Sequence, residues 1–337
     1  MSSELIIGGQ SIGPGETKDI NIFVAKQYDF TEISMPVKVI RGREDGPRLF
    51  VCAAIHGDEV IGVEIIKRLI NNKALKKLRG TLIAAPIVNV FGFNNLTRYL
   101  PDRRDLNRCF PGSPGGSLAA RLANLFLTEI VDNSTHGIDI HTGSRHRTNL
   151  PQVRAGLQDP QTAQLAREFH VPVILDADVI QGSLRQVVSE RKIPLLVFEG
   201  GEALRYDEVV IRSGLSGILA VMNRLEMITL QKRGKNVEPI VAKGRYWVRA
   251  VHSGILIIKK RLGSIVKEGD LLGVISDPLG NNNFEIRVDK PGLIIGYSQL
   301  PLVNRGDAIF HIATFERHKM LEKSLEDFDD KFDYEER

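Results

Sequence analysis

The sequence predicts an α/β fold with a mixed, largely parallel sheet flanked by helices, followed by a smaller all-β domain. Between residues 45 and 235, apolar runs alternate with stretches of helical periodicity, a pattern typical of layered strands and helices. Polar side chains that suit metal binding or catalysis follow the ends of three expected strands, where the active sites of such sheets lie. After residue 235 the helix signals stop, and short β-rich runs are separated by turns.

The elements follow in chain order. Residues 1–44 are expected to be β-rich, because Gly8-Gly9 and Gly13-Pro14-Gly15 indicate turns and the segment 35–40, Met-Pro-Val-Lys-Val-Ile, indicates a strand. In the next domain, 45–235, strands are expected at 48–55, 81–88, 137–141, 171–175 and 195–198. Helices are expected at 59–70, at 117–132 with Ser117 as the N-cap, and at about 207–225.

Two further regions complete the predicted organisation. Residues 236–315 carry runs such as Tyr246-Trp247-Val248, divided by turns such as 267–270 and 281–283, and are expected to form a small all-β domain. Residues 316–337 form a highly charged C-terminal tail that could begin as a helix.

Composition excludes several classes of protein. The net charge is only +4, from 45 basic and 41 acidic residues, and no long basic block is present, so we expect no nucleic-acid partner. No stretch reaches the roughly 18 apolar residues of a membrane helix, so we expect no membrane partner. Two cysteines, Cys52 and Cys109, provide no disulfide framework and fit a reducing compartment. These observations predict a soluble cytoplasmic protein and leave a homo-oligomer open.

His56 and Glu59 are the first candidate ligands of a metal. They follow an apolar strand, lie three residues apart and flank a glycine, so both side chains can face one point. His141 follows another short strand, and Asp139, two residues before it, could orient its imidazole. Two imidazoles and one carboxylate are a ligand set of hydrolytic zinc. The alternative is a surface histidine followed by an ordinary helix N-terminus, with Glu59 in its first turn.

Glu199 is the candidate general base. It ends the apolar run 194–198, where partial desolvation would raise its pKa towards the range useful for proton transfer. The alternatives are a salt-bridged glutamate, or Glu202 in its place. Cys109 is expected to be small buried filler rather than a nucleophile.

Arginines in the loop 98–110 could bind a carboxylate or stabilise an oxyanion, while a solvated basic loop is the alternative for at least one of Arg103 and Arg104. A second basic stretch, which includes Arg147, Asn149 and Arg154, could contribute to the same cleft.

Four motifs in this order resemble the succinylglutamate desuccinylase/aspartoacylase family, which is related to the zinc carboxypeptidases. They are His56-Gly57-Asp58-Glu59, Asp105-Leu106-Asn107-Arg108, Asp139-Ile140-His141-Thr142-Gly143 and Phe198-Glu199. The resemblance covers about residues 45–235 and extends to the β-rich region. It implies a zinc-carboxypeptidase-like fold, one zinc ion per chain and hydrolysis of a small anionic N-acyl amino acid.

The resemblance also implies residue roles. His56, Glu59 and His141 match the zinc ligands, and Glu199 matches the general base. Asn107 and Arg108 match the pair that holds a substrate carboxylate. Arg98 resembles the arginine that polarises the scissile carbonyl, with Arg103 or Arg104 as alternatives, and a further substrate arginine is either Arg154 or Arg185.

The β-rich region is similar to a biotinyl/lipoyl-type barrel-sandwich domain, although it lacks a Met-Lys-Met hinge, so a swinging-arm lysine is not expected. In the family this domain borders the active-site entrance. The sequence thus predicts a zinc-dependent deacylase. The rival hypotheses are a zinc carboxypeptidase acting on peptide C-termini and a non-catalytic binding protein; the acyl group, the amine and an ester substrate stay open.

Overall fold

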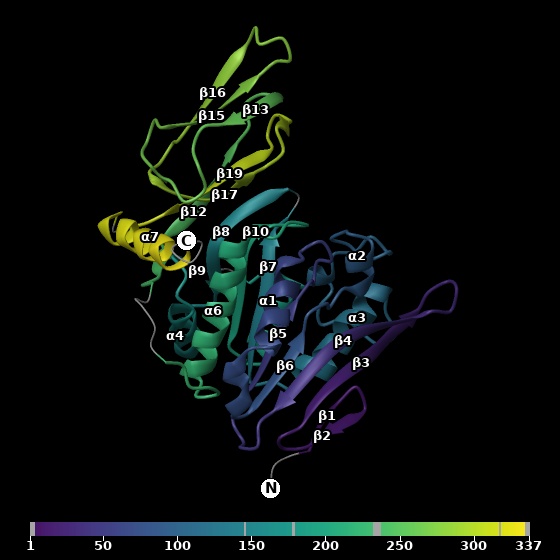
Figure 1. Cartoon of the computed structure of the whole chain (residues 1–337). Helices are drawn as coiled ribbons and strands as arrows, with labels where there is room; N and C mark the ends of the chain where they lie inside the picture. The colour runs from purple at the N-terminus through teal and green to yellow at the C-terminus, as the bar shows by residue number, and fades with distance from the viewer. Residues whose placement is uncertain (1–3, 145, 177–178, 232–236, 317, 334–337) are drawn as a thin grey trace.

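A computed structural model describes residues 4–144, 146–176, 179–231, 237–316 and 318–333 (Figure 1). A single 13-stranded sheet runs through most of the molecule. Its strands, in spatial order, are β12 (Gly244–Arg249), β19 (Ala308–Thr314), β17 (Gly292–Ser298), β8 (Arg147–Ala155), β10 (Leu195–Glu202), β7 (His136–Gly143), β5 (Arg48–Ala53), β6 (Thr81–Ala85), β4 (Glu32–Arg41) and β3 (Thr17–Lys26). Beside this path, β9 (Val173–Asp176) pairs with β8, β11 (Ile240–Ala242) with β9, and β14 (Ile265–Val266) with β17.

The sheet is mixed, as predicted. Its central strands β6, β5, β7 and β10 are parallel to one another, whereas β8 is antiparallel to β10, and β4 is antiparallel to both β6 and β3. The parallel strands bring their carboxyl ends to one edge, and this edge carries the candidate site.

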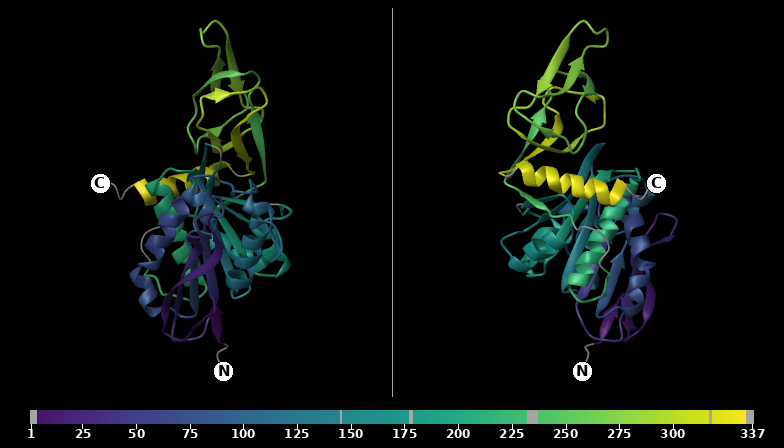
Figure 2. Two further views of the ribbon diagram at one scale, coloured as in Figure 1. Left: turned by 90° about the vertical axis from the view of Figure 1, so that its right-hand side faces the viewer. Right: turned by 60° about the vertical axis from the view of Figure 1, so that its left-hand side comes forward.

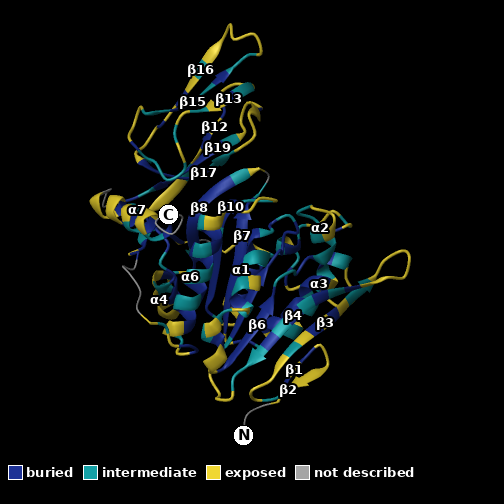
Figure 3. Ribbon diagram, viewed as in Figure 1, coloured by how far each residue is buried: buried dark blue, intermediate teal, exposed yellow. Residues whose placement is uncertain are grey.

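Helices cover both faces of the central strands. Along β5, Leu49, Val51 and Ala53 belong to one apolar cluster and Phe50 and Cys52 to another, as the two-residue period of a strand requires. The first cluster packs under α1 (Ile61–Ile70), α4 (Pro160–Glu168) and α6 (Glu208–Arg224). The second packs under α3 (Leu118–Phe126), which continues as a π-helical turn, Leu127–Val131, and under α5 (Leu184–Glu190). Figure 3 shows the central strands buried between these layers.

Short elements complete this part of the fold. They are α2 (Val90–Asn94), the 3-10 turns Lys73–Lys77 and Leu106–Arg108, and the hairpin of β1 (Leu5–Ile7) and β2 (Gln10–Ile12). Ser117 caps α3 as expected, its hydroxyl accepting from the Ala120 N–H. The helix expected from residue 59 begins at Ile61, so Glu59 lies in the turn before it. β8, α4 and α5 were not predicted.

The C-terminal strands do not form a detached sheet. β17 pairs with β8, and β19 and β12 extend the main sheet, so the predicted catalytic and β-rich regions share hydrogen bonds. A second sheet packs on β12, β19 and β17 across an apolar cluster. Its strands are β16 (Asn283–Arg287), β15 (Leu271–Ser276), β13 (Gly254–Ile258) and β18 (Leu302–Val303).

Figure 2 shows this β sandwich at one end of the molecule and α7 (His318–Asp333) running across the junction. Leu321 and Phe328 of α7 are buried. The expected boundary at residues 235–236 and the end of the charged tail, 334–337, lie outside the described residues. Within the described ranges, no helix combines the length and apolar character needed to cross a membrane.

Candidate metal centre

The turn after β5 brings His56 and Glu59 together. Ala54 adopts a left-handed φ of 50°, which redirects the chain at the end of the strand. Gly57 packs against α2 so closely that a Cβ there would lie 1.9 Å from the carbonyl carbon of Gly92, so only glycine fits. The Glu59 N–H donates to the His56 carbonyl, 3.1 Å away, and this closes the turn.

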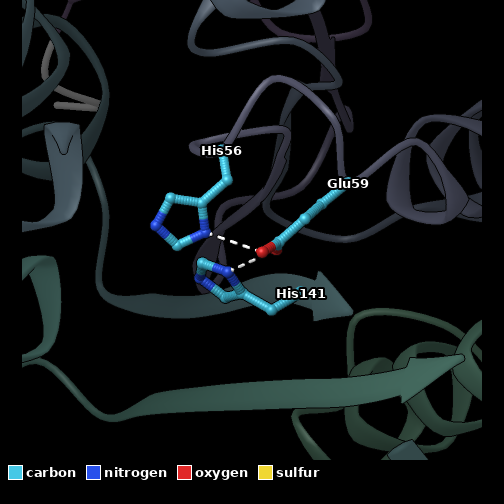
Figure 4. Close-up of side chains that lie close together, drawn as sticks. All are labelled: His56, Glu59 and His141. Atoms are coloured by element: carbon cyan, nitrogen blue, oxygen red, sulfur yellow. Dashed lines mark hydrogen bonds and ion pairs between the residues drawn. The ribbon is translucent and has the colours of Figure 1, made fainter. Parts of the chain in front are cut away.

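His141, on β7, meets both residues (Figure 4). His56 Nδ1 lies 2.8 Å from Glu59 Oε1, and His141 Nδ1 lies 2.8 Å from Glu59 Oε2. One ligand atom from each of the three residues lies within 4.8 Å of the others, and all three side chains are buried. The residues singled out in the sequence therefore form one group that could hold a metal ion.

Two more carboxylates hold the far nitrogens of the imidazoles. His141 Nε2 lies 2.7 Å from Asp139 Oδ2, and His56 Nε2 lies 3.2 Å from Asp105 Oδ1. An imidazole whose Nε2–H donates to a carboxylate presents Nδ1 to a metal, and this is the usual support of a histidine ligand. Asp139 lies where it could orient His141, as expected from the sequence. The contact of Asp105 with His56 was not predicted.

Electrostatics tie the group together. Burial alone would raise the pKa of Glu59, but the two imidazoles outweigh burial and hold that pKa well below its usual range. Burial would lower the pKa of His141, yet Asp139 and Glu59 raise it well above its usual value. The pKa of His56 is also raised, since Glu59 and Asp105 outweigh its burial. The cluster is thus a carboxylate between two basic imidazoles. A divalent cation bound among them would take the place of the protons that the imidazoles share with the carboxylate.

Glu199 lies beside this group, because β10 pairs with β7 so that Glu199 is opposite His141. Its Oε2 accepts from Arg154 Nη2 at 2.8 Å and from Asn149 Nδ2 at 2.9 Å, both on β8. Within the described chain, both contacts fall on Oε2. The glutamate is therefore ion-paired and at the same time lines the cavity.

The structure distinguishes among the candidate arginines. Arg98 lines the cavity, with Nη1 3.3 Å from Glu59 and Nη2 2.9 Å from Asp105. Arg103 and Arg104 are exposed and do not line the cavity; Arg104 lies 3.8 Å from Asp102. Asn107 and Arg108 line it, as do both Arg154 and Arg185.

The cavity has a volume of about 250 Å³, and part of its lining was not foreseen. Trp247 of β12 and His311 of β19 line it, although they lie far along the chain from the other residues. Thr142 and Ser144 also contribute to its lining. No local pattern in the sequence marks Trp247 or His311, since their position depends on the pairing of β17 with β8.

Comparison with known proteins settles the family. The model of the succinylglutamate desuccinylase/aspartoacylase catalytic domain matches residues 45–225, more than half of the chain. The protein belongs to this family. The family expected from the four motifs is thereby confirmed.

Similar proteins match over most of the chain. N-alpha-acetyl-L-2,4-diaminobutyric acid deacetylase of Halomonas elongata is 24% identical over 294 residues, which are 83% of this chain and 86% of the relative. The product-bound structure of the ectoine utilization protein EutE (DoeB) from Ruegeria pomeroyi has a TM-score of 0.81 at 21% identity and covers 88% of this chain and 95% of its own. The succinylglutamate desuccinylase/aspartoacylase of Rhodobacter sphaeroides has a TM-score of 0.80 at 23% identity, with coverages of 89% and 96%. These structures share the fold.

Proposed function

We propose that this protein is a zinc-dependent hydrolase that cleaves the amide bond of a small N-acyl amino acid. The observation that carries the proposal is the buried group of His56, Glu59 and His141 in a cavity that also holds Glu199. Membership of the desuccinylase/aspartoacylase family and the deacetylase relative support the same reaction class.

The donor set fits zinc. Two imidazole nitrogens and one carboxylate, each imidazole supported by another carboxylate, are typical of catalytic zinc with an open position. Zinc bound there would act as a Lewis acid on the substrate carbonyl and lower the pKa of a water molecule to about 7.

Glu199 would move the proton. Arg154 and Asn149 fix its Oε2, so Oε1 is the oxygen placed to accept a proton from the attacking water and pass it to the departing amine. The ion pair with Arg154 is compatible with a role of Glu199 as general base, because it orients the side chain and leaves the second carboxylate oxygen for the proton.

Arg98 would stabilise the oxyanion. Asp105 and Glu59 hold its guanidinium beside the candidate ligands, which preorganises a charged donor where negative charge develops. Asn107 and Arg108 would bind the substrate carboxylate. The Leu184 N–H donates to Asn107 Oδ1 at 2.8 Å, and this contact orients the amide within the cavity wall.

A small substrate suits the cavity better than a peptide. Trp247 and His311 belong to the lining of a cavity of only about 250 Å³, a size that favours acyl amino acids over polypeptide C-termini. The free thiols Cys52 and Cys109 are in keeping with the cytoplasmic location that we propose.

The test compares Glu199→Gln with Glu202→Gln, a matched change three residues further along β10 that does not line the cavity. Glu199→Gln should reduce kcat by about 10²- to 10⁴-fold on N-acyl amino acids, while metal analysis still finds about one zinc per chain. Glu202→Gln should retain activity. Near-normal turnover by Glu199→Gln would remove Glu199 from this role, and faster cleavage of dipeptides than of N-acyl amino acids would favour a carboxypeptidase.

A further inference from the structure

A second cavity lies next to the one that holds the candidate metal centre, which is called the catalytic cavity below. The second cavity also has a volume of about 250 Å³. Among the described residues, its lining comes from the end of β8, the first turn of α4, helix α5 and the segment that leads into β10. Of these lining residues, only Arg185 was a candidate for binding substrate.

The strands place the two cavities one after the other on the same face of the sheet. Val197 of β10 and Arg154 of β8 are partners in the antiparallel pairing, and both line the catalytic cavity. Leu195, two residues earlier on β10, and Gly156, directly after β8, line the second cavity. Because side chains two residues apart on a strand share a face, the second cavity continues the catalytic cavity along β10.

Arg185 and the chain before α5 separate the two cavities. Ile180 lines the catalytic cavity, whereas its neighbour Val179 lines the second one. Arg185, in the first turn of α5, lines both. A molecule in either cavity can therefore contact the same guanidinium.

Helix α5 is also bonded to the proposed substrate-binding turn. The Leu184 N–H at its start donates to Asn107 Oδ1 at 2.8 Å, and the Phe110 N–H donates to the Gly182 carbonyl at 3.0 Å. The turn that carries Asn107 and Arg108 is thus held by the same segment that carries Arg185. A molecule that displaces Arg185 or α5 from the second cavity would act directly on the substrate-binding side of the partition.

The second cavity combines positive charge with an apolar surface. Arg185 and Lys192 line it, and the one carboxylate in its described lining, Asp159, is occupied in capping α4. Its Oδ2 accepts from the Thr162 N–H at 2.8 Å and from the Thr162 hydroxyl at 2.6 Å. Residues 193–195, which are isoleucine, proline and leucine, supply apolar surface. This lining suits a small carboxylate that carries an alkyl chain.

We propose that the second cavity is a regulatory site for a small aliphatic carboxylate, whose binding draws Arg185 out of the catalytic cavity. The substrate then loses one cationic contact and binds more weakly. Such an effector acts because its affinity differs between the two positions of Arg185. The effect on turnover rests on the proposed function, whereas binding of the carboxylate does not.

Kinetics with hexanoate as the probe test this regulation on the zinc-loaded enzyme. Because the substrate still binds through Asn107 and Arg108, KM should rise at least fivefold with increasing hexanoate and then level off, with little change in kcat. Arg185→Gln should have a higher KM from the outset, and hexanoate should not change it further. An unchanged KM, or a KM that rises without a limit as in simple competition with substrate, would overturn the proposal.

Two variants address the second cavity alone. Ser189→Phe fills it and Lys192→Met removes one of its charges, and neither residue lines the catalytic cavity. Both variants should keep the wild-type kcat and KM without hexanoate and lose most of its effect. Lys76→Met is the matched control, since this exposed lysine lines neither cavity, and it should respond as the wild type does. A full response to hexanoate in either cavity variant would refute the regulatory site.

Calorimetric titration measures binding without turnover. From propionate to hexanoate, Kd should fall about twofold to fourfold for each added methylene, because the chain covers the apolar surface. Hexanamide, which keeps the shape but lacks the charge, should bind at least tenfold more weakly.

The titration also separates this proposal from the proposed function. If hexanoate binds in this way, Ser189→Phe abolishes its binding and no N-acyl amino acid is hydrolysed, the proposed function fails and the second site stands. If N-acyl amino acids are hydrolysed and Ser189→Phe binds hexanoate as tightly as the wild type does, the second site fails and the proposed function stands.

Discussion

Replacing Asp139 by asparagine tests the metal centre at the residue that supports it. The carboxylate of Asp139 is buried, lies 2.7 Å from His141 Nε2 and also accepts from the Cys52 thiol at 3.3 Å. Asparagine keeps the shape but removes the charge that makes the imidazole a better ligand. Loss of such a supporting carboxylate typically costs 10- to 100-fold in metal affinity, which is about 1.4 to 2.7 kcal/mol.

Asp105 provides an internal comparison. Its contact with His56 Nε2 is longer, 3.2 Å, and its side chain is 18% exposed, so Asp105→Asn should weaken zinc binding less than Asp139→Asn does. It should nevertheless reduce kcat strongly, because Asp105 also holds Arg98 at 2.9 Å. Asp139→Asn should therefore reduce mainly the affinity for zinc, and Asp105→Asn should reduce mainly kcat.

The assay is competition for zinc between each purified variant and a chromophoric chelator of known affinity, combined with kcat on an N-acyl amino acid. Asp132→Asn serves as a control, since Asp132 pairs with Arg191 and neither residue lines the cavity. Zinc affinity of Asp139→Asn equal to that of the wild type, or a larger loss in Asp105→Asn, would refute the reasoning.

Three further outcomes follow from the structure. When free zinc is present at 100 times its Kd, removing it should lower the free energy of unfolding by about 2.7 kcal/mol and lower Tm by about 4 °C for a chain of 337 residues. If calorimetry shows no change in Tm when a chelator is added, the folded protein does not bind zinc in this way. Because burial in the folded protein lowers the pKa of His311 from 6.5 to about 3, the unfolded state binds more protons between these values, so stability should fall as pH drops through this window, by up to about 1.4 kcal/mol per unit. Urea unfolding at pH 7 and pH 5 should show a smaller difference for His311→Phe than for the wild type, and equal differences would count against this assignment. Gly217→Ala should destabilise the protein by about 1 to 3 kcal/mol, since its Cβ would lie 2.2 Å from the Phe169 ring, whereas Gly115→Ala, where a Cβ meets nothing within 4 Å, should be neutral in the same urea assay.

The ligand candidates and the candidate base could be predicted from sequence because each lies at or just beyond the carboxyl end of an apolar strand. His56, His141 and Glu199 were placed together because parallel strands end at one edge of a sheet, and the structure brings them to that edge. Helix α1 begins two residues later than expected, because Glu59 faces the two imidazoles instead of starting the helix.

β8 could not be recognised from its sequence. It carries Asn149, Gln152 and Arg154 beside only a few apolar residues, and it contains Pro151, which usually argues against an inner strand. The proline is accommodated where the pairing with β10 is irregular, between the partners of Glu199 and Gly201. Asn149 and Arg154 line the cavity, so polar residues occupy positions where a strand with one apolar face would carry apolar ones.

The choice among arginines also needed coordinates. Arg98, Arg103 and Arg104 lie in the same loop and cannot be distinguished from the sequence. Only the fold shows that Arg98 contacts Glu59, whereas the other two are exposed to solvent. The place of Trp247 and His311 in the cavity lining could not be predicted for a different reason. It depends on pairing between strands that are distant in sequence, and the residues near them in the chain do not indicate that pairing.

The hydrogen bonds between β17 and β8 have a consequence for engineering this fold. β8 pairs with the Glu199 strand on one side and with β17 on the other, so a chimaera joined near residue 235 would exchange the Trp247–His311 wall while keeping the strand that it must dock on. The unit to transplant is therefore β8 together with the C-terminal strands. Grafting both should carry substrate preference from one relative to another, whereas grafting the C-terminal strands alone should leave mismatched edges and an open cavity.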